Sequence, residues 1–319
     1  MNFSKSFKAP APIPPQGIVN AIRLMESSQL YRYNFDLDIT ENTDIASLDN
    51  ELASEVAKLE VEFSRYTGHK YVVAVNSCGS ALFLALKALE IPYRNKVFTN
   101  AFTFTAVPSS IVHAGGTPVY LECDHQYLID IDDLENKIQA NPDAKHMIVS
   151  HMRGHVSDMD AIQAICREAD LTLIEDCAHS LGAEWCDKTS GQSRMIGHHG
   201  KIACFSSQSY KHLNSGEGGF IATNDEKIAA YCILGAGSYE DLYRKHLSRP
   251  FDDTLFETLK PHVPNFSLRM SNLTAVVLRP QITQLEEKIA KCNLLYKTLM
   301  TTLAPARNIY IPSPLEQVT

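Results

Sequence analysis

Short apolar runs and segments with helical spacing of apolar residues alternate along most of this 319-residue chain. Strands that alternate with helices predict a parallel sheet that is covered by helices on both faces. We therefore expect an α/β fold whose large domain has three layers, α/β/α, around a mostly parallel sheet. The expected strands are residues 71–75, 96–100, 118–121, 146–150, 172–176, 202–206 and 219–223.

Four of the six expected helices lie between these strands, one precedes the first strand and one follows the last, and the pattern also suggests domain limits. Residues 1–20 are rich in proline and are expected to form an extended arm. A charged, proline-containing segment at 240–265 breaks the alternation of strands and helices. We therefore place the large domain at 21–245 and the start of a smaller C-terminal domain at 246–319. Ser157 is the expected cap of one helix. The expected helices are 45–67, a helix opening at 81–86, 105–114, 131–139, 158–169 and a long stretch at 273–303.

Composition excludes several classes of protein. The net charge is −8 and no basic tract of five residues occurs, which argues against nucleic-acid binding. No apolar run reaches the roughly 18 residues of a membrane span, and the N-terminus lacks the apolar stretch of a signal peptide. The eight cysteines include no CxxC pair, which favours reduced thiols in a cytoplasmic protein. We expect no metal site, and we interpret Cys186 and the adjacent His198 and His199 as loop residues.

Polar residues follow several expected strands, where an open parallel sheet binds its ligands. The turn at 76–80 joins a strand to a helix and would point backbone N–H groups at an anion. Lys211 follows another strand and precedes a glycine-rich turn, and Asp176 ends a third strand. A lysine that can form a Schiff base, with a separate aspartate for a pyridinium nitrogen, is the minimum equipment for pyridoxal phosphate (PLP) chemistry. A surface lysine and a helix-capping aspartate are the alternatives.

Two long motifs carry a resemblance to a known family. They are IEDCAHSLG at 174–182 and FSSQSYKHLNSGEGG at 205–219, and shorter pieces lie at 76–82, 102–106 and 269–272. Together they resemble the DegT/DnrJ/EryC1/StrS sugar aminotransferases, which are PLP-dependent and have PLP fold type I. The resemblance runs from about Leu59 to Leu285. The family's small domain usually continues past the point where this chain ends.

The resemblance implies roles for residues near the lysine. Lys211 would bind PLP covalently and transfer protons, and Asp176 would hold the pyridine nitrogen. His179 would donate a hydrogen bond to the phenolic oxygen, although a core histidine is a serious alternative. Gly79, Ser80 and Ser206 would form the phosphate site, with Gln208 lining the pocket. Ordinary helix capping by Ser80 and a strand end at Ser206 are the alternatives.

Two further residues are assigned by the same resemblance. Phe104 aligns with the aromatic residue that stacks on the pyridine ring, and the alternative is a core phenylalanine. Arg269 lies in a segment that reaches the partner subunit's active site and helps to hold phosphate there. A solvated arginine is the alternative for Arg269. The resemblance therefore implies a homodimer with shared active sites.

Arg153 is a departure from the family pattern. It lies in HMRGH at 151–155, where the family more often has an aliphatic or aromatic residue and then glycine. An arginine beside the cofactor could bind a carboxylate bidentately, either on the donor or on the sugar. A sugar acid such as an oxidised octulosonate is then a possible acceptor, beside a nucleotide-linked keto-sugar. A surface loop arginine is the alternative.

The resemblance implies a PLP-dependent aminotransferase. It would move an amino group from an amino acid, with L-glutamate as the implied donor, to a keto or aldehyde sugar. The setting would be amino-sugar synthesis for a surface polysaccharide, lipopolysaccharide or secondary metabolite. A sugar dehydratase of the same family is one alternative, which Lys211 disfavours because dehydratases have histidine in its place. A non-catalytic PLP-binding protein is the other.

Overall fold

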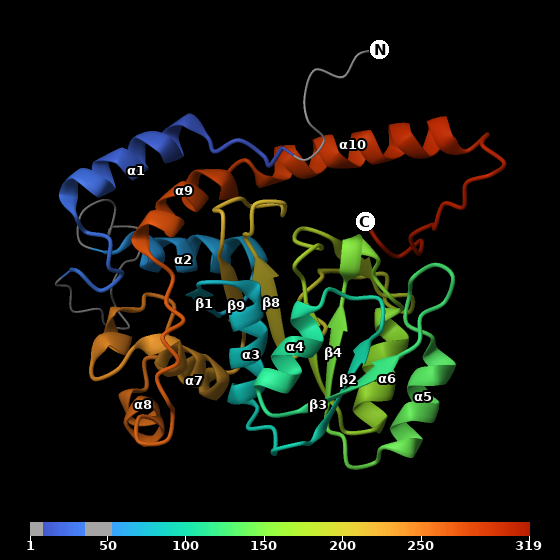
Figure 1. Ribbon diagram of the computed structural model, residues 1–319, viewed down its shortest axis with the longest axis horizontal. Coiled ribbons are helices and arrows are strands. Elements are labelled where there is room, and N and C mark those ends of the chain that lie inside the picture. Colours follow the sequence, from blue (N-terminus) through green and yellow to red (C-terminus); the bar gives the residue numbers. More distant parts are fainter. Residues whose placement is uncertain (1–8, 36–52) are drawn as a thin grey trace.

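The structure is a computed structural model that describes residues 9–35 and 53–319 (Figure 1). Its centre is a seven-stranded sheet in the order β1-β9-β8-β5-β4-β2-β3. Strand β9 is antiparallel to both of its neighbours, and the other pairs are parallel. The expected mostly parallel sheet is therefore confirmed. The strands are β1 (Tyr71–Val75), β2 (Lys96–Asn100), β3 (Thr117–Leu121), β4 (His146–Ser150), β5 (Thr172–Asp176), β8 (Ile202–Ser206) and β9 (Gly219–Thr223).

Helices cover both faces of this sheet, which confirms the three-layer prediction. Successive strand residues point to opposite faces, and a strand that is buried on both faces must be apolar throughout. In β1, Val72 and Ala74 join one core, and Val73 and Val75 join the other. The first face packs on α2 (Glu55–Thr67), α5 (Ile131–Ala140) and α6 (Met159–Glu168), and the second packs on α3 (Cys78–Ala88), α4 (Ala106–His113) and α7 (Glu226–Gly237).

The N-terminal region differs from the expected extended arm. Helix α1 (Pro15–Ser27) begins inside the proline-rich stretch and packs along α9 (Figure 1). A proline in the first turn costs a helix nothing, because that N–H has no partner within the helix. The extended arm is therefore wrong for residues 15–20. Residues 9–14 form neither helix nor strand, and residues 1–8 lie outside the described residues.

The long helical stretch expected at the C-terminal end is two helices, α9 (Asn272–Ile282) and α10 (Leu285–Leu303). Arg279 of α9 forms ion pairs with Glu55 and Glu62 of α2, so α9 is fastened to the large sheet domain. Phe256, from the unpredicted helix α8 (Asp253–Leu259), is also buried in one of the two cores. The domain boundary at 245/246 stays a prediction.

Several local details also differ from the expectations. Asp158, and not Ser157, caps α6 by accepting from Ala161 N, because the Ser157 hydroxyl accepts from Ile129 N instead. Helix α3 begins at Cys78. The expected start of α2 at residue 45 lies outside the described residues. No helix among residues 9–35 and 53–319 has both the length and the apolar character of a membrane span. Further unpredicted elements are α7, η1 (Met152–Gly154), η2 (Leu242–Lys245), β6 (Glu184–Cys186) and β7 (Ser193–Met195).

Candidate active site

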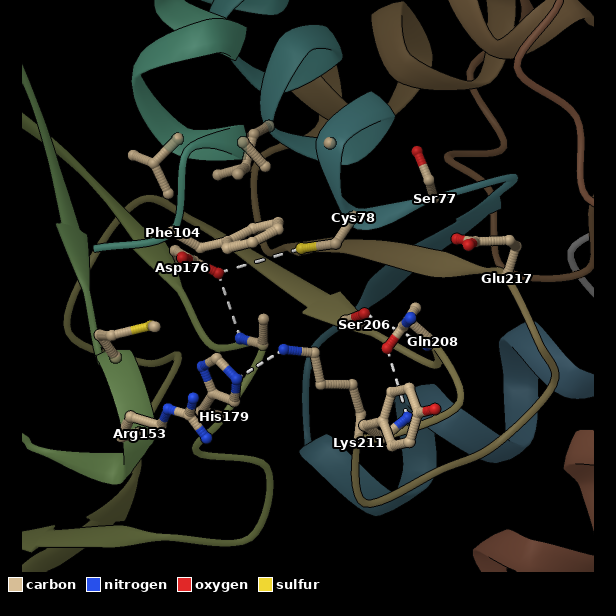
Figure 2. A pocket seen from close by; sticks show the side chains of 17 residues that line it. Ser77, Cys78, Phe104, Arg153, Asp176, His179, Ser206, Gln208, Lys211 and Glu217 are labelled. Carbon is tan, nitrogen blue, oxygen red and sulfur yellow. Dashed lines mark hydrogen bonds between the residues drawn. The ribbon is translucent and has the colours of Figure 1, made fainter. Parts of the chain in front are cut away.

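A cavity of about 790 Å³ lies where β5 and β8 end and α3 begins (Figure 2). This is the edge of the sheet where an open α/β fold binds its ligands. Eight of the ten predicted site residues line the cavity, and the other two, Ser80 and Arg269, do not. The eight are Gly79, Phe104, Arg153, Asp176, His179, Ser206, Gln208 and Lys211.

Asp176 is held in one orientation at the end of β5. Ser150 Oγ donates to its Oδ2 at 2.7 Å, and Ala178 N donates to its Oδ1 at 3.2 Å. Ser150 is itself fixed, because its backbone N and O bond the side chain of Asn100 at 2.9 and 3.0 Å. The sequence placed Ser150 and Asn100 at strand ends without giving either a role. The structure adds them as the residues that orient the carboxylate.

Lys211 lies in the loop between β8 and β9, with its Nζ 2.6 Å from Nε2 of His179 (Figure 2). Burial lowers the pKa of Lys211, while the negative charge of Asp176 opposes that shift. Burial and the positive charges of Lys211 and Arg153 lower the pKa of His179 to about 4. At neutral pH His179 is therefore uncharged, and its Nε2 accepts a hydrogen bond from the Lys211 ammonium. The predicted contact of His179 with a cofactor oxygen stays a prediction.

The first turn of α3 lies at one end of the cavity and has the geometry that suits an anion. Ser77 caps the helix by accepting from Ser80 N at 3.0 Å, and Ser77, Cys78 and Gly79 all line the cavity. The first N–H groups of a helix have no partner within it and attract negative charge. A Cβ on Gly79 would meet only Ser77 Oγ, at 3.8 Å, so the space in front of this turn is open. The Ser80 hydroxyl points elsewhere and donates to Asn76 Oδ1 at 2.7 Å.

Gly219, the first residue of β9, packs directly on the same turn of α3. A Cβ there would lie 2.5 Å from both Ser77 C and Cys78 N, which is closer than such atoms can approach. The last glycine of the GEGG segment is therefore a steric requirement. It lets the strand that closes the Lys211 loop reach the backbone of the anion-binding turn.

Phe104 and Arg153 line the cavity from the side of β2 and β4. The Phe104 ring is 59% exposed, which is unusual for a large apolar side chain and leaves a ring face free for stacking. Arg153 belongs to η1 and has a left-handed backbone, with φ 59°. Figure 2 shows its guanidinium beside the His179 ring. Tyr210 and Glu217 also line the cavity, and the sequence did not single them out.

Arg269 lies outside the cavity lining. Its guanidinium donates to Gly237 O at 3.0 Å and to Ser267 Oγ at 2.9 Å. Its backbone pairs with Val75 at the end of β1, so it lies close to the sheet edge that carries the site. Its expected contribution to a partner subunit's site stays a prediction.

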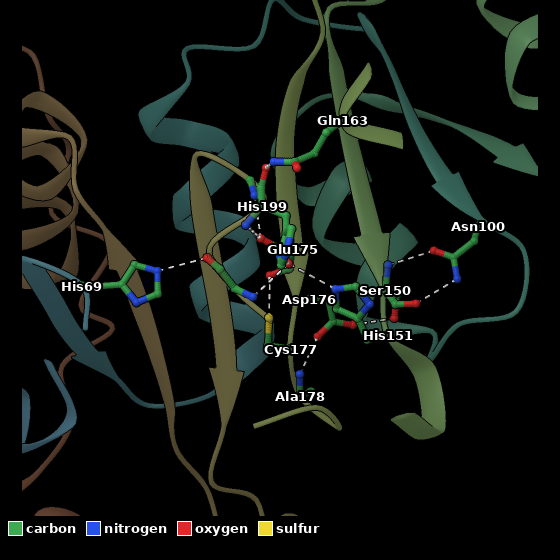
Figure 3. Close-up of polar contacts among 12 residues, drawn as sticks. His69, Asn100, Ser150, His151, Gln163, Glu175, Asp176, Cys177, Ala178 and His199 are labelled. Carbon is green, nitrogen blue, oxygen red and sulfur yellow. Dashed lines mark hydrogen bonds and ion pairs between the residues drawn. The ribbon is translucent and has the colours of Figure 1, made fainter. Parts of the chain in front are cut away.

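Behind Asp176, on the other side of β5, Glu175 organises a buried polar network (Figure 3). Its oxygens accept from the backbone N of Gly197, His199 and Gly200 at 2.9, 2.7 and 2.6 Å. The His151 Nε2 lies 3.3 Å from Oε2. Burial alone would raise the pKa of Glu175, but His151 and His199 outweigh it and hold that pKa well below its usual range. No local sequence pattern indicates this network, because its partners come from distant loops.

His151, Glu175 and Cys177 bring ligand-type atoms within 4.8 Å of one another, and all three are buried. We interpret the group as structural. The Glu175 oxygens are already engaged by backbone amides, and burial raises the pKa of the Cys177 thiol well above its usual range, so that it stays protonated. A protonated thiol is a poor metal ligand.

The residues around the cavity fit PLP. A partly buried amine, an oriented carboxylate, a helix N-terminus and an exposed aromatic ring face one space. The amine matches the cofactor's carbonyl, and the carboxylate matches its ring nitrogen. The helix N-terminus matches its phosphate, and the aromatic ring matches its ring face. Lys211, Asp176, the α3 turn and Phe104 are the residues that would hold it.

Comparisons with known proteins give relatives of this chain. The spore coat polysaccharide biosynthesis protein SpsC of Bacillus subtilis is 39% identical over 175 residues, which are 55% of this chain and 43% of SpsC. The GDP-perosamine synthase of Caulobacter vibrioides is 31% identical over 247 residues, 76% of this chain and 61% of the synthase. The chain thus spans less than two thirds of these relatives.

A solved structure shares the fold. The aminotransferase from Psychrobacter cryohalolentis superposes with a TM-score of 0.76 at 24% identity, over 94% of this chain and 69% of that one. The model of one family, described as the DegT/DnrJ/EryC1/StrS aminotransferase family, matches residues 41–318. Because this match spans most of the sequence, the chain belongs to the DegT/DnrJ/EryC1/StrS aminotransferase family.

Proposed function

We propose that this protein is a PLP-dependent aminotransferase that transfers an amino group from an amino acid to a keto or aldehyde sugar. The observation that carries the proposal is the shared cavity of Lys211 and Asp176, in which Lys211 Nζ is held 2.6 Å from a neutral His179. An amine with a lowered pKa and a fixed carboxylate are what the chemistry requires of the protein.

Each residue has a distinct task in this proposal. When bound, PLP supplies an electron sink for the carbon next to the transferred nitrogen. Asp176, oriented by Ser150, keeps a proton on the ring nitrogen. Lys211 moves a proton to and from the substrate carbon, and burial lowers its pKa, which favours the free amine. The α3 turn binds the phosphate, and Phe104 covers the ring.

The relatives support a sugar as the acceptor. One is named for spore coat polysaccharide biosynthesis, and the other is a GDP-perosamine synthase. We propose the same class of role here, in amino-sugar synthesis with L-glutamate as the donor. A role in lipopolysaccharide synthesis, a cytoplasmic location and a homodimer with Arg269 completing the partner's site belong to the same proposal.

The visible absorption spectrum of the PLP-loaded protein tests it. We expect a band that disappears on addition of L-glutamate, with one 2-oxoglutarate released per site in a single turnover. Lys211→Ala should lose both the band of the covalently bound cofactor and the response. Lys201→Ala is the control, because Lys201 lies on the surface, in an ion pair with Asp225.

Other outcomes point to the two alternatives. A band that no amino acid changes would favour a non-catalytic PLP-binding protein. Loss of water from a keto sugar, without net transfer of nitrogen to it, would favour a dehydratase. If PLP gives no band at all, the assignment of Lys211 is wrong.

A further inference from the structure

Arg153 is a cation in the cavity that the cofactor's phosphate does not require. Besides Lys211, which the proposed function assigns to the cofactor, the cavity has two features that attract anions, the first turn of α3 and the Arg153 guanidinium. Figure 2 shows them on different sides of the pocket, with Ser77 above Lys211 and Arg153 beside His179. One PLP carries one phosphate, and the helix turn with its open space serves it. The guanidinium is left for another anion.

No acidic side chain neutralises this arginine. Within residues 9–35 and 53–319, no carboxylate lies within ion-pair distance of Arg153. Two acidic residues line the cavity. Asp176 is engaged by Ser150 and Ala178, and Glu217 lies across the pocket from Arg153 in Figure 2. An arginine at a cavity wall with an unpaired planar fork is equipped to take a carboxylate in two parallel hydrogen bonds.

The backbone around Arg153 is built to hold it there. Its φ of 59° lies in the left-handed region, which is strained for a residue with a Cβ. His151 N donates to Asp176 O at 3.1 Å, and Gly154 N donates to His151 O at 3.0 Å. The His151 ring contacts the buried Glu175. The turn that presents Arg153 is thereby tied to the strand that carries Asp176.

We propose that Arg153 is the receptor for a carboxylate of the substrate. The inference rests on the proposed aminotransferase function and adds the chemical class that this site recognises. In an amino acid the α-carboxylate is one carbon away from the nitrogen, and that nitrogen must reach the position of Lys211 Nζ. Arg153 lies on the His179 side of Lys211, and His179 Nε2 is 2.6 Å from that Nζ. A carboxylate on the acceptor sugar has the same chemistry, and the experiment separates the two sources.

The test compares Arg153→Met and Arg153→Lys with the unchanged protein, all loaded with PLP. Methionine keeps an unbranched stem without charge, and lysine keeps the charge without the fork. The matched control is Arg94→Met, because Arg94 also has a left-handed backbone, with φ 63°, and stacks on Tyr93 away from the cavity. The affinity for PLP is measured first in each variant.

Succinate gives the first readout, since it carries carboxylates but no amine and needs no turnover. Its dissociation constant, from the shift of the cofactor band, should rise about 10- to 100-fold in Arg153→Met and less in Arg153→Lys, as loss of a charge-assisted hydrogen-bonded pair requires. Arg94→Met should bind succinate as the unchanged protein does. This readout remains valid even if no amino acid reacts, so a failure of the proposed function is distinguishable from a failure of this inference.

Two further arms identify the source of the carboxylate. For the donor, the dissociation constant of L-glutamate should rise by a similar factor in Arg153→Met, while that of its α-amide should not change. For the acceptor, binding of glucuronate and glucose to the pyridoxamine-phosphate form is compared by saturation-transfer NMR. In Arg153→Met, the binding of glucuronate should weaken and that of glucose should not change. In either arm, a loss of affinity for the carboxylate ligand alone supports Arg153 as the group that binds the carboxylate. Equal loss for charged and neutral ligands, or a loss of PLP affinity alone, overturns it.

Discussion

Two neighbouring carboxylates at the end of β5 have opposite surroundings. Glu175 points into the core behind the sheet, where three backbone amides and two histidines enclose it. Asp176 points into the cavity, where one hydroxyl and one amide fix it and the remaining space is open. The alternation of a strand sends adjacent residues to opposite faces. One carboxylate therefore serves folding and the other is available for chemistry.

Replacing Glu175 should have the largest effect, and the effect should be on stability. Glu175→Leu leaves the amides of Gly197, His199 and Gly200 buried without an acceptor. We expect a loss of about 3–5 kcal/mol in the free energy of unfolding, measured by urea denaturation of the protein without cofactor. The control is Glu287→Leu, which removes an exposed ion pair with Lys291 on α10 and should leave the free energy of unfolding nearly unchanged. If the two substitutions changed the free energy of unfolding equally, Glu175 would have no special role in folding.

Replacing Asp176 should reverse the pattern. Asp176→Asn keeps the shape and removes the charge that, in the proposed function, holds a proton on the ring nitrogen. We expect the rate of the half-reaction with L-glutamate to fall about 10²- to 10³-fold, as measured by stopped-flow absorption. The free energy of unfolding should change by less than about 1 kcal/mol. A large loss of stability with an unchanged rate would show that the two carboxylates have been assigned the wrong way round.

The stability of the protein at acid pH should also depend on Glu175. Its pKa is lowered in the folded protein, so its stabilising contribution is complete above the unfolded pKa of about 4.3 and is lost as the pH falls below that value. We expect this group to remove about 1.4 kcal/mol of stability per pH unit below about pH 4.3. The slope should be smaller in Glu175→Gln, measured by urea denaturation between pH 3 and 6. Parallel curves for the two proteins would refute this role of Glu175.

The smallest effect should come from the residue that orients Asp176. Ser150→Ala removes the 2.7 Å hydrogen bond to Asp176 Oδ2. We expect about a 10-fold slower half-reaction, in keeping with one hydrogen bond to a charged group. Ser150→Thr retains the hydroxyl and should recover most of the rate. Should the threonine variant be as slow as the alanine variant, the hydroxyl is not what orients Asp176.

The sheet and the cavity could be predicted because both depend on local patterns. A strand that is buried on both faces is a continuous apolar run, so β1, β4 and β5 were placed at their observed bounds. The polar residues that follow such strands meet at one edge by topology alone. Lys211 and Asp176 are placed at the cavity by this reasoning, while the roles that the family motifs imply for them stay predictions.

The remaining features depend on contacts between distant segments. Helix α1 begins at a proline that a composition argument assigns to an extended arm. Ser157 has the side chain of a helix cap, but its hydroxyl accepts a hydrogen bond from the backbone N of Ile129, which is far away in the sequence. The direction of the Ser80 hydroxyl depends on Asn76 and Ser77 in the folded turn. The Glu175 network joins β4, β5 and the loop at 197–200, and no local pattern marks it.

The contact between Gly219 and the first turn of α3 limits how far the parts of the site can move relative to one another. The loop that carries Lys211 leaves β8 and returns at Gly219, where its backbone lies against Ser77 and Cys78 without room for a methyl group. The Lys211 loop and the first turn of α3 are therefore parts of one rigid frame. In the proposed function, a cofactor held by Lys211 at one end and by this turn at the other could not pivot, so its reactive face would be oriented before any substrate binds.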